Sequence, residues 1–122
     1  NVHAMSHPVS AYFDVSHGIA NAILLPIILD YNKISDVGKY LKIYNYISKI
    51  PANKEAFTPE MLVDEIKKLN GELGIPCSLS EVGVTQDKIK DMAIDAMKSG
   101  NIAVNPRSSR QVDIERLYRL AM

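Results

Sequence analysis

Three histidines, His3, His7 and His17, are the residues of this sequence best suited to metal chemistry. They are its only histidines, and all of them lie in the first seventeen residues. A neutral imidazole offers one lone pair in a fixed direction, at roughly 2.0 to 2.1 Å from a zinc-like ion. The cluster therefore indicates a divalent-cation site. The alternative is that the three are unrelated: one capping a helix, one exposed and one held in the core.

The spacing of the histidines leaves open which of them share an ion. On one helix, His3 and His7 would lie a single turn apart on the same face. Metalloproteases with this spacing carry their general base, a glutamate, directly after the first histidine, whereas Ala4 stands there in this chain. Proteolysis of that kind is therefore not expected.

A chain reversal is needed before His17 can join the other two. In one straight helix, the fourteen residues from His3 to His17 would separate them by about 21 Å at 1.5 Å per residue. Pro8 weakens the first helix, and the stretch "YFDVSHG" has turn character through Asp14 and Gly18. His17, near the start of a second helix, can thus fold back towards His3, His7 or both, and the sequence does not choose among these.

The length and composition are typical of one domain with its own core. The chain has 122 residues, and its 14 Lys and Arg balance its 14 Asp and Glu, so nothing favours nucleic acid or an anionic membrane as a partner. The single cysteine, Cys77, excludes an internal disulfide and a cysteine-based zinc site, and fits a reducing cytoplasm. We interpret it as a small loop hydrophobe rather than a nucleophile.

The hydrophobic periodicity predicts an all-α domain of about six helices, because no segment shows the alternation of a half-buried strand. Thr58 and Thr85 are predicted caps, and Gly74, Ile75 and Pro76 are predicted to stop the helix after Thr58. The predicted helices cover residues 2–12, 19–31, 35–50, 59–73, 86–99 and a last segment around 114–120. The predicted core faces carry Val37, Tyr40, Leu41, Tyr44 and Ile47; Leu62, Ile66, Leu69 and Leu73; Ile89, Met92, Ala93, Ala96 and Met97; and Ile114, Leu117 and Leu120.

The apolar run at residues 19–29 is predicted to be a core helix, not a membrane span. It has about half of the roughly 20 residues that a bilayer requires, and Pro26 interrupts it. The N-terminal stretch also lacks the charge pattern of a signal peptide.

The segment "HAMSHPVSAYFDVSHGIANAILLP" resembles the metal-binding segment of the iron-containing (group III) alcohol dehydrogenases. That family's pattern joins the same histidine spacing to an HG-to-LLP apolar run. The likeness continues in order through "YN" at Tyr31 and Asn32, "LGIPCSLSEVGV" at residues 73–84 and "NPR" at residues 105–107, so it covers essentially the whole chain.

The resemblance implies a fold and a set of roles. Members have an N-terminal NAD(P)-binding domain and an all-helical C-terminal domain of a dehydroquinate synthase-like fold, with the active site between them. By position, His3 and His17 would be metal ligands together with an Asp and a His from upstream. His7 would not be a ligand, but would lie near the nicotinamide and substrate in a polar or proton-relay role. The metal would be Fe²⁺ or Zn²⁺, acting as a Lewis acid while hydride passes between NAD or NADP and an alcohol or aldehyde.

This chain lacks the family's glycine-rich nucleotide turn and its upstream Asp and His. We therefore expect residues 1–122 to be the C-terminal metal-binding domain alone, without the N-terminal NAD(P)-binding domain, and inactive in isolation. The full enzyme is expected to be a cytoplasmic homo-oligomer that binds neither nucleic acid nor membranes. The alternative is a free-standing helical module that binds a metal or a protein partner.

Overall fold

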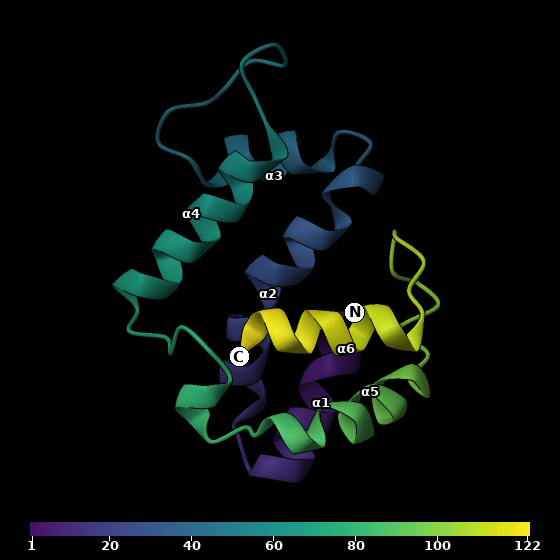
Figure 1. The fold of residues 1–122 in the computed structure, drawn as a ribbon. Helices are drawn as coiled ribbons and strands as arrows, with labels where there is room; N and C mark the ends of the chain where they lie inside the picture. The colour runs from purple at the N-terminus through teal and green to yellow at the C-terminus, as the bar shows by residue number, and fades with distance from the viewer.

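Six α-helices and no β-strand make up the computed structural model, which describes residues 1–122 (Figure 1). The all-α prediction and the number of helices are confirmed. The helices are α1 (Val2–Phe13), α2 (His17–Asn32), α3 (Lys39–Ile47), α4 (Pro59–Glu72), α5 (Ile89–Met97) and α6 (Gln111–Ala121), with short 3₁₀ turns at Lys33–Ser35, Ser80–Val82 and Gln86–Lys88.

The helices form one main core and one smaller cluster, joined by α2. In Figure 1, α1, α5 and α6 lie at one end, α3 and α4 at the other, and α2 runs between them. The main core draws its buried side chains from α1, α2, α5, α6 and the loop before α5, whereas Tyr40, Tyr44 and Leu62 form the smaller cluster. Because the histidines lie on α1 and α2, the main core is what positions them.

Helix α1 continues through Pro8, the residue expected to weaken it. Proline has no N–H to donate to the carbonyl of Ala4, which costs the helix one hydrogen bond. The helix nevertheless runs to Phe13, and Pro8 is buried. Met5 and Val9 beside it are also buried in the main core, so packing offsets the lost bond.

Helix α2 is the predicted core helix. Ala20, Ile23, Leu24 and Ile28 are all buried in the main core, and Pro26 lies inside the helix. No helix of this structure has both the length and the apolar character needed to cross a membrane.

Helix α3 is shorter than the predicted 35–50 segment. The Asp36 carboxylate accepts hydrogen bonds from the backbone N–H groups of Lys39 and Tyr40 at 3.0 and 3.2 Å, so the helix starts after it. Gly38, with φ 107°, supplies the left-handed turn that leads into the helix. Of the predicted core face, only Tyr40 and Tyr44 are buried; Val37 is 90% exposed.

Helix α4 starts and stops as predicted, but its predicted core face is half wrong. Thr58 precedes Pro59, and Gly74, with φ 69°, ends the helix with its N–H bonded to the Gly71 carbonyl. Leu62 is buried, but Leu69 and Leu73 are 47% and 66% exposed. The spacing identifies one face, but the neighbouring helices cover only its first half.

Helices α5 and α6 complete the main core. The predicted face of α5 is buried at Ile89, Met92, Ala93 and Ala96, whereas on α6 Ile114 and Leu117 are buried and Leu120 is exposed. Tyr118, which the predicted core face of α6 omits, is fully buried, and its hydroxyl donates a 2.6 Å hydrogen bond to the Met5 carbonyl. This bond ties α6 to α1 two residues from His3.

Candidate metal centre

The three histidines come together because the chain reverses between α1 and α2. Asp14 adopts the left-handed conformation, with φ 54° and ψ 31°, and its N–H bonds to the Ser10 carbonyl to close α1. The Ser16 side chain then accepts from the Ile19 N–H at 3.4 Å and caps α2. His17 is therefore the first residue of α2. Gly18, predicted to belong to the turn, lies inside the first turn of α2 instead.

His17 lies beside both of the other histidines, so the fold brings it towards His3 and His7 alike. The ring centroids are 5.2 Å apart for His3 and His17, 5.0 Å for His7 and His17, and 6.1 Å for His3 and His7. One ring nitrogen of each can be chosen so that all three lie within 4.8 Å of one another, and all three side chains are exposed. A single site can therefore draw on all three.

Only one pair of histidines makes direct nitrogen-to-nitrogen contact. Nδ1 of His3 lies 3.1 Å from Nε2 of His17. Two nitrogens bound at about 2.0 to 2.1 Å to one ion, at an angle of about 90 to 110°, are themselves about 2.9 to 3.4 Å apart. The spacing of this pair therefore fits two ligands of one divalent cation, and imidazole is a ligand that suits iron and zinc.

The histidine cluster contains no carboxylate of this chain. Two imidazoles leave the coordination sphere of a divalent cation incomplete, since zinc binds four ligands in structural sites and three protein ligands in catalytic ones. Water or groups from outside this cluster would therefore be needed to complete such a site.

His7 also borders a hollow between α1 and α5. The hollow is lined by Ala4, His7, Pro8, Ala11 and Tyr12 from α1 and by Asp95, Lys98 and Ser99 from α5 and the residues after it. Two other hollows, one beside Arg107 and one beside Tyr44, contain none of the three histidines.

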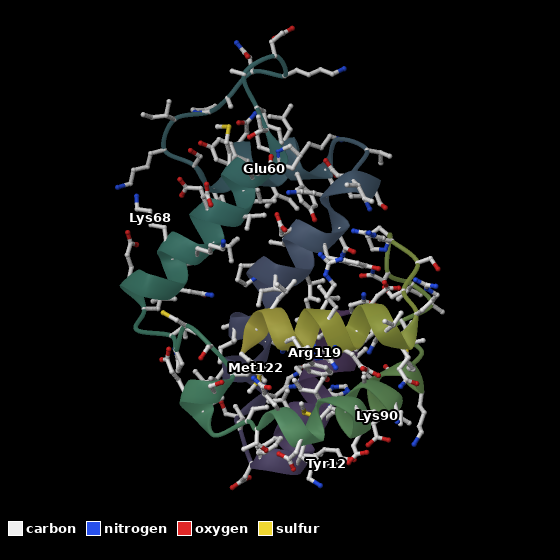
Figure 2. The ribbon with its side chains drawn as sticks, in the orientation of Figure 1. Tyr12, Glu60, Lys68, Lys90, Arg119 and Met122 are labelled. Atoms are coloured by element: carbon white, nitrogen blue, oxygen red, sulfur yellow. The ribbon has the colours of Figure 1, made fainter.

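Part of the wall of this hollow is polar and held in place by hydrogen bonds. The Tyr12 hydroxyl donates to Asp95 at 2.8 Å, and Lys98 forms an ion pair with Asp95 at 2.7 Å. Figure 2 shows Tyr12 at the end of the molecule where α1 and α5 meet. The hydrogen bonds from Lys98 and Tyr12 hold the pKa of Asp95 below its usual value, and the Asp95 carboxylate raises the pKa of Tyr12. Asp95 therefore stays ionised and Tyr12 protonated at neutral pH.

A buried network of amides anchors the start of α1, where His3 lies. The side chains of Asn32 and Asn105 exchange two hydrogen bonds, of 2.8 and 3.0 Å. Asn105 also accepts from the backbone nitrogen of Asn1 at 2.9 Å, and the Asn1 side chain donates to Ser109 at 2.8 Å. The network thus joins the start of α1, the end of α2 and the loop before α6.

Arg107 packs against Tyr31 beside this network. Its guanidinium carbon lies 3.9 Å from the centre of the Tyr31 ring, and one of its N–H groups donates to the Tyr31 carbonyl at 2.7 Å. The motifs at residues 31–32 and 105–107 therefore have a structural role: they hold the end of α2 and the loop before α6 against the start of α1, which carries His3.

Sequence reasoning did not single out Ser6, whose hydroxyl lies among the histidines. Its place three residues after His3 on the same helix is a signal that could have identified it. Cys77 is exposed in the loop after α4, where it contributes nothing to the histidine cluster.

Comparison with known proteins places the whole chain in one family. The family described as "Fe-containing alcohol dehydrogenase family, C-terminal" matches residues 1–122. The chain is 33% identical over 121 residues to a 1,3-propanediol dehydrogenase of Citrobacter freundii, covering 98% of this chain and 31% of that protein. It is 35% identical over 121 residues to a lactaldehyde reductase of Escherichia coli K12, covering 98% of this chain and 32% of the relative.

A solved structure shares the fold. A 1,3-propanediol oxidoreductase superposes with a TM-score of 0.90 at 33% identity, covering 99% of this chain and 32% of the other. The chain thus spans about a third of the length of the relatives that it matches.

Proposed function

Because this chain belongs to the Fe-containing alcohol dehydrogenase family and matches its C-terminal part, we propose that it is the metal-binding part of an NAD(P)-dependent oxidoreductase. The full protein would transfer a hydride between an alcohol or aldehyde and NAD or NADP. The observation that carries this proposal is the 3.1 Å approach of His3 and His17 from two different helices. This arrangement is a preformed half-site for a divalent cation.

His3 and His17 would hold the metal from one side, and an NAD(P)-binding domain outside residues 1–122 would supply the remaining ligands. Fe²⁺ or Zn²⁺ bound there would act as a Lewis acid on the substrate oxygen. The two imidazoles keep their positions because α1 and α2 are fixed by the main core and by the amide network around Asn105. A fixed geometry of this kind lowers the cost of ordering ligands when an ion binds.

His7 would serve the substrate rather than the metal. It borders the hollow whose wall carries Tyr12 and Asp95, so its ring can hold or move a proton at an oxygen atom placed there. The exposure of all three histidines is consistent with a cleft that a second domain covers. We expect residues 1–122 alone to show no turnover of an alcohol with NAD(P).

Three single substitutions in the full-length protein test these roles. His3→Ala and His17→Ala should lose bound metal, because each removes one of two ligands supplied by this chain. His7→Ala should keep its metal and lower kcat. The measurements are metal content of purified variants and steady-state kinetics with a small alcohol and NAD or NADP.

A different pattern would contradict the assignment. If His7→Ala lost the metal while His3→Ala retained it, His7 would be the ligand and His3 the bystander. Turnover of an alcohol by residues 1–122 alone would contradict the proposed need for a second domain.

A further inference from the structure

The Ser6 side chain is completely buried and lies against the imidazole of His17. Ser6 is 0% exposed, although His3, His7 and His17 around it are exposed. Its Oγ is 3.4 Å from Nδ1 of His17 and 3.3 Å from the backbone carbonyl oxygen of His3. This hydroxyl therefore touches the nitrogen of His17 that faces away from His3.

The number of protons on the Ser6 hydroxyl and on His17 selects one tautomer of His17. The His3 carbonyl can only accept a hydrogen bond, and the Ser6 hydroxyl has one proton to give. Both contacts are hydrogen bonds at once only if Ser6 donates to the carbonyl and accepts from an N–H at Nδ1 of His17. The other tautomer would leave the buried Ser6 hydroxyl with one hydrogen bond instead of two, so the Nδ1–H arrangement is favoured.

The Nδ1–H tautomer leaves the lone pair of His17 on Nε2. That nitrogen is the one that lies 3.1 Å from Nδ1 of His3. Histidines that bind metals generally donate their second ring N–H to a fixed acceptor, which sets the tautomer and the ring orientation.

We propose that Ser6 is a positioning residue: its hydroxyl accepts from Nδ1–H of His17 and so directs the Nε2 lone pair into the metal site. The metal part of this inference rests on the proposed function, in which His17 is a ligand. The tautomer part does not, because it concerns the protein without metal. Ser6 suits the task because it is buried on α1, so helix and core packing fix its position.

The first experiment measures the tautomer in metal-free, full-length protein labelled with ¹⁵N at histidine. Long-range ¹H–¹⁵N correlations distinguish Nδ1–H from Nε2–H, and a His17→Gln variant identifies the resonances. In the unsubstituted protein we expect His17 as the Nδ1–H form. An Nε2–H form there would overturn the proposal without any need for a Ser6 variant.

Substitution then tests whether Ser6 is the cause. Ser6→Ala should shift His17 towards Nε2–H, whereas Ser6→Thr, which keeps a hydroxyl, should retain Nδ1–H. Ser10→Ala is the matched control, because Ser10 lies one turn along the same helix and its buried Oγ has no hydrogen-bond partner. An unchanged tautomer in Ser6→Ala, or the same change in Ser10→Ala, would overturn the proposal.

The second experiment measures Zn²⁺ affinity of the same proteins by competition with a chelator. Loss of an outer partner of a metal-bound histidine typically weakens binding about 10- to 100-fold. We expect at least a tenfold loss for Ser6→Ala and less than a twofold change for Ser10→Ala. Equal affinities for Ser6→Ala and the unsubstituted protein would overturn the metal part. If the unsubstituted protein binds no Zn²⁺ through His17, the proposed function fails instead, while the tautomer result stands by itself.

Discussion

Replacing Asn105 by alanine is expected to destabilise the protein and disturb the start of α1. The Asn105 side chain makes four hydrogen bonds. It donates to Asn32 at 2.8 Å and to the Arg107 carbonyl at 2.6 Å, and it accepts from Asn32 at 3.0 Å and from the backbone nitrogen of Asn1 at 2.9 Å. Asn32 is only 8% exposed, so water cannot replace the lost partner freely.

The magnitude follows from the groups left without partners. A net hydrogen bond is worth about 0.5 to 1.5 kcal/mol, and a buried polar group without a partner costs about 1 to 3 kcal/mol. Asn105→Ala breaks both bonds of the Asn32 amide, so we expect a loss of about 3 kcal/mol in the free energy of unfolding. Urea unfolding followed by circular dichroism measures it, and the midpoint should fall with an unchanged slope.

Asn101→Ala is the matched control, since Asn101 is an exposed asparagine in the same loop. It should change the free energy of unfolding by less than about 0.5 kcal/mol. If Asn105→Ala were as mild as this control, the amide network would not hold the loop and α1 together. The Zn²⁺ affinity of Asn105→Ala should also fall, because the network includes Asn1, which lies two residues before His3.

Further predictions concern other parts of the fold. Tyr118→Phe should cost about 1 to 3 kcal/mol, because it removes a buried hydrogen bond to a carbonyl of α1. Burial raises the pKa of Tyr118 in the folded state. The contribution of Tyr118 to the free energy of unfolding is therefore complete below its unfolded pKa near 10 and is lost as the pH rises above that value. Unfolding curves of Tyr118→Phe should show a weaker loss of stability above about pH 10. Leu62→Ala should cost about 2 to 5 kcal/mol in thermal or urea unfolding, whereas Leu73→Ala, at an exposed position, should cost under about 1 kcal/mol. The backbone N–H of Arg110 holds the pKa of Asp113 below its usual value. The small stabilisation by Asp113 should therefore be present above about pH 4 and fade in more acidic solution. Asp113→Asn should reduce this dependence of the free energy of unfolding on pH.

Local sequence signals predicted the helices well because caps and breakers act over a few residues. Thr58 and Pro59 mark the start of α4, and Gly74 marks its end. Hydrophobic periodicity could not predict which part of an apolar helix face is covered by neighbouring helices. Leu62 and Leu73 share the predicted face of α4, yet only the first is covered.

In the candidate site, too, local signals predicted the turn, whereas contacts between helices could not be predicted from the sequence. Turn signals around Asp14 predicted that His17 folds back, but the spacing left open whether it would lie beside His3, His7 or both. The closest contact joins His3 to His17, and this depends on how α1 and α2 pack. Ser6 and the amide pair of Asn32 and Asn105 depend on that packing too, so their roles emerge only in three dimensions.

The central claim is that His3 and His17 bind the same divalent cation. Anomalous diffraction at the zinc edge, from crystals of the Zn²⁺-loaded full-length protein, tests it most directly. We expect one peak within about 2.0 to 2.3 Å of a ring nitrogen of both His3 and His17, with His7 outside bonding distance. A peak bonded to His7 with either His3 or His17 unbound would contradict the account.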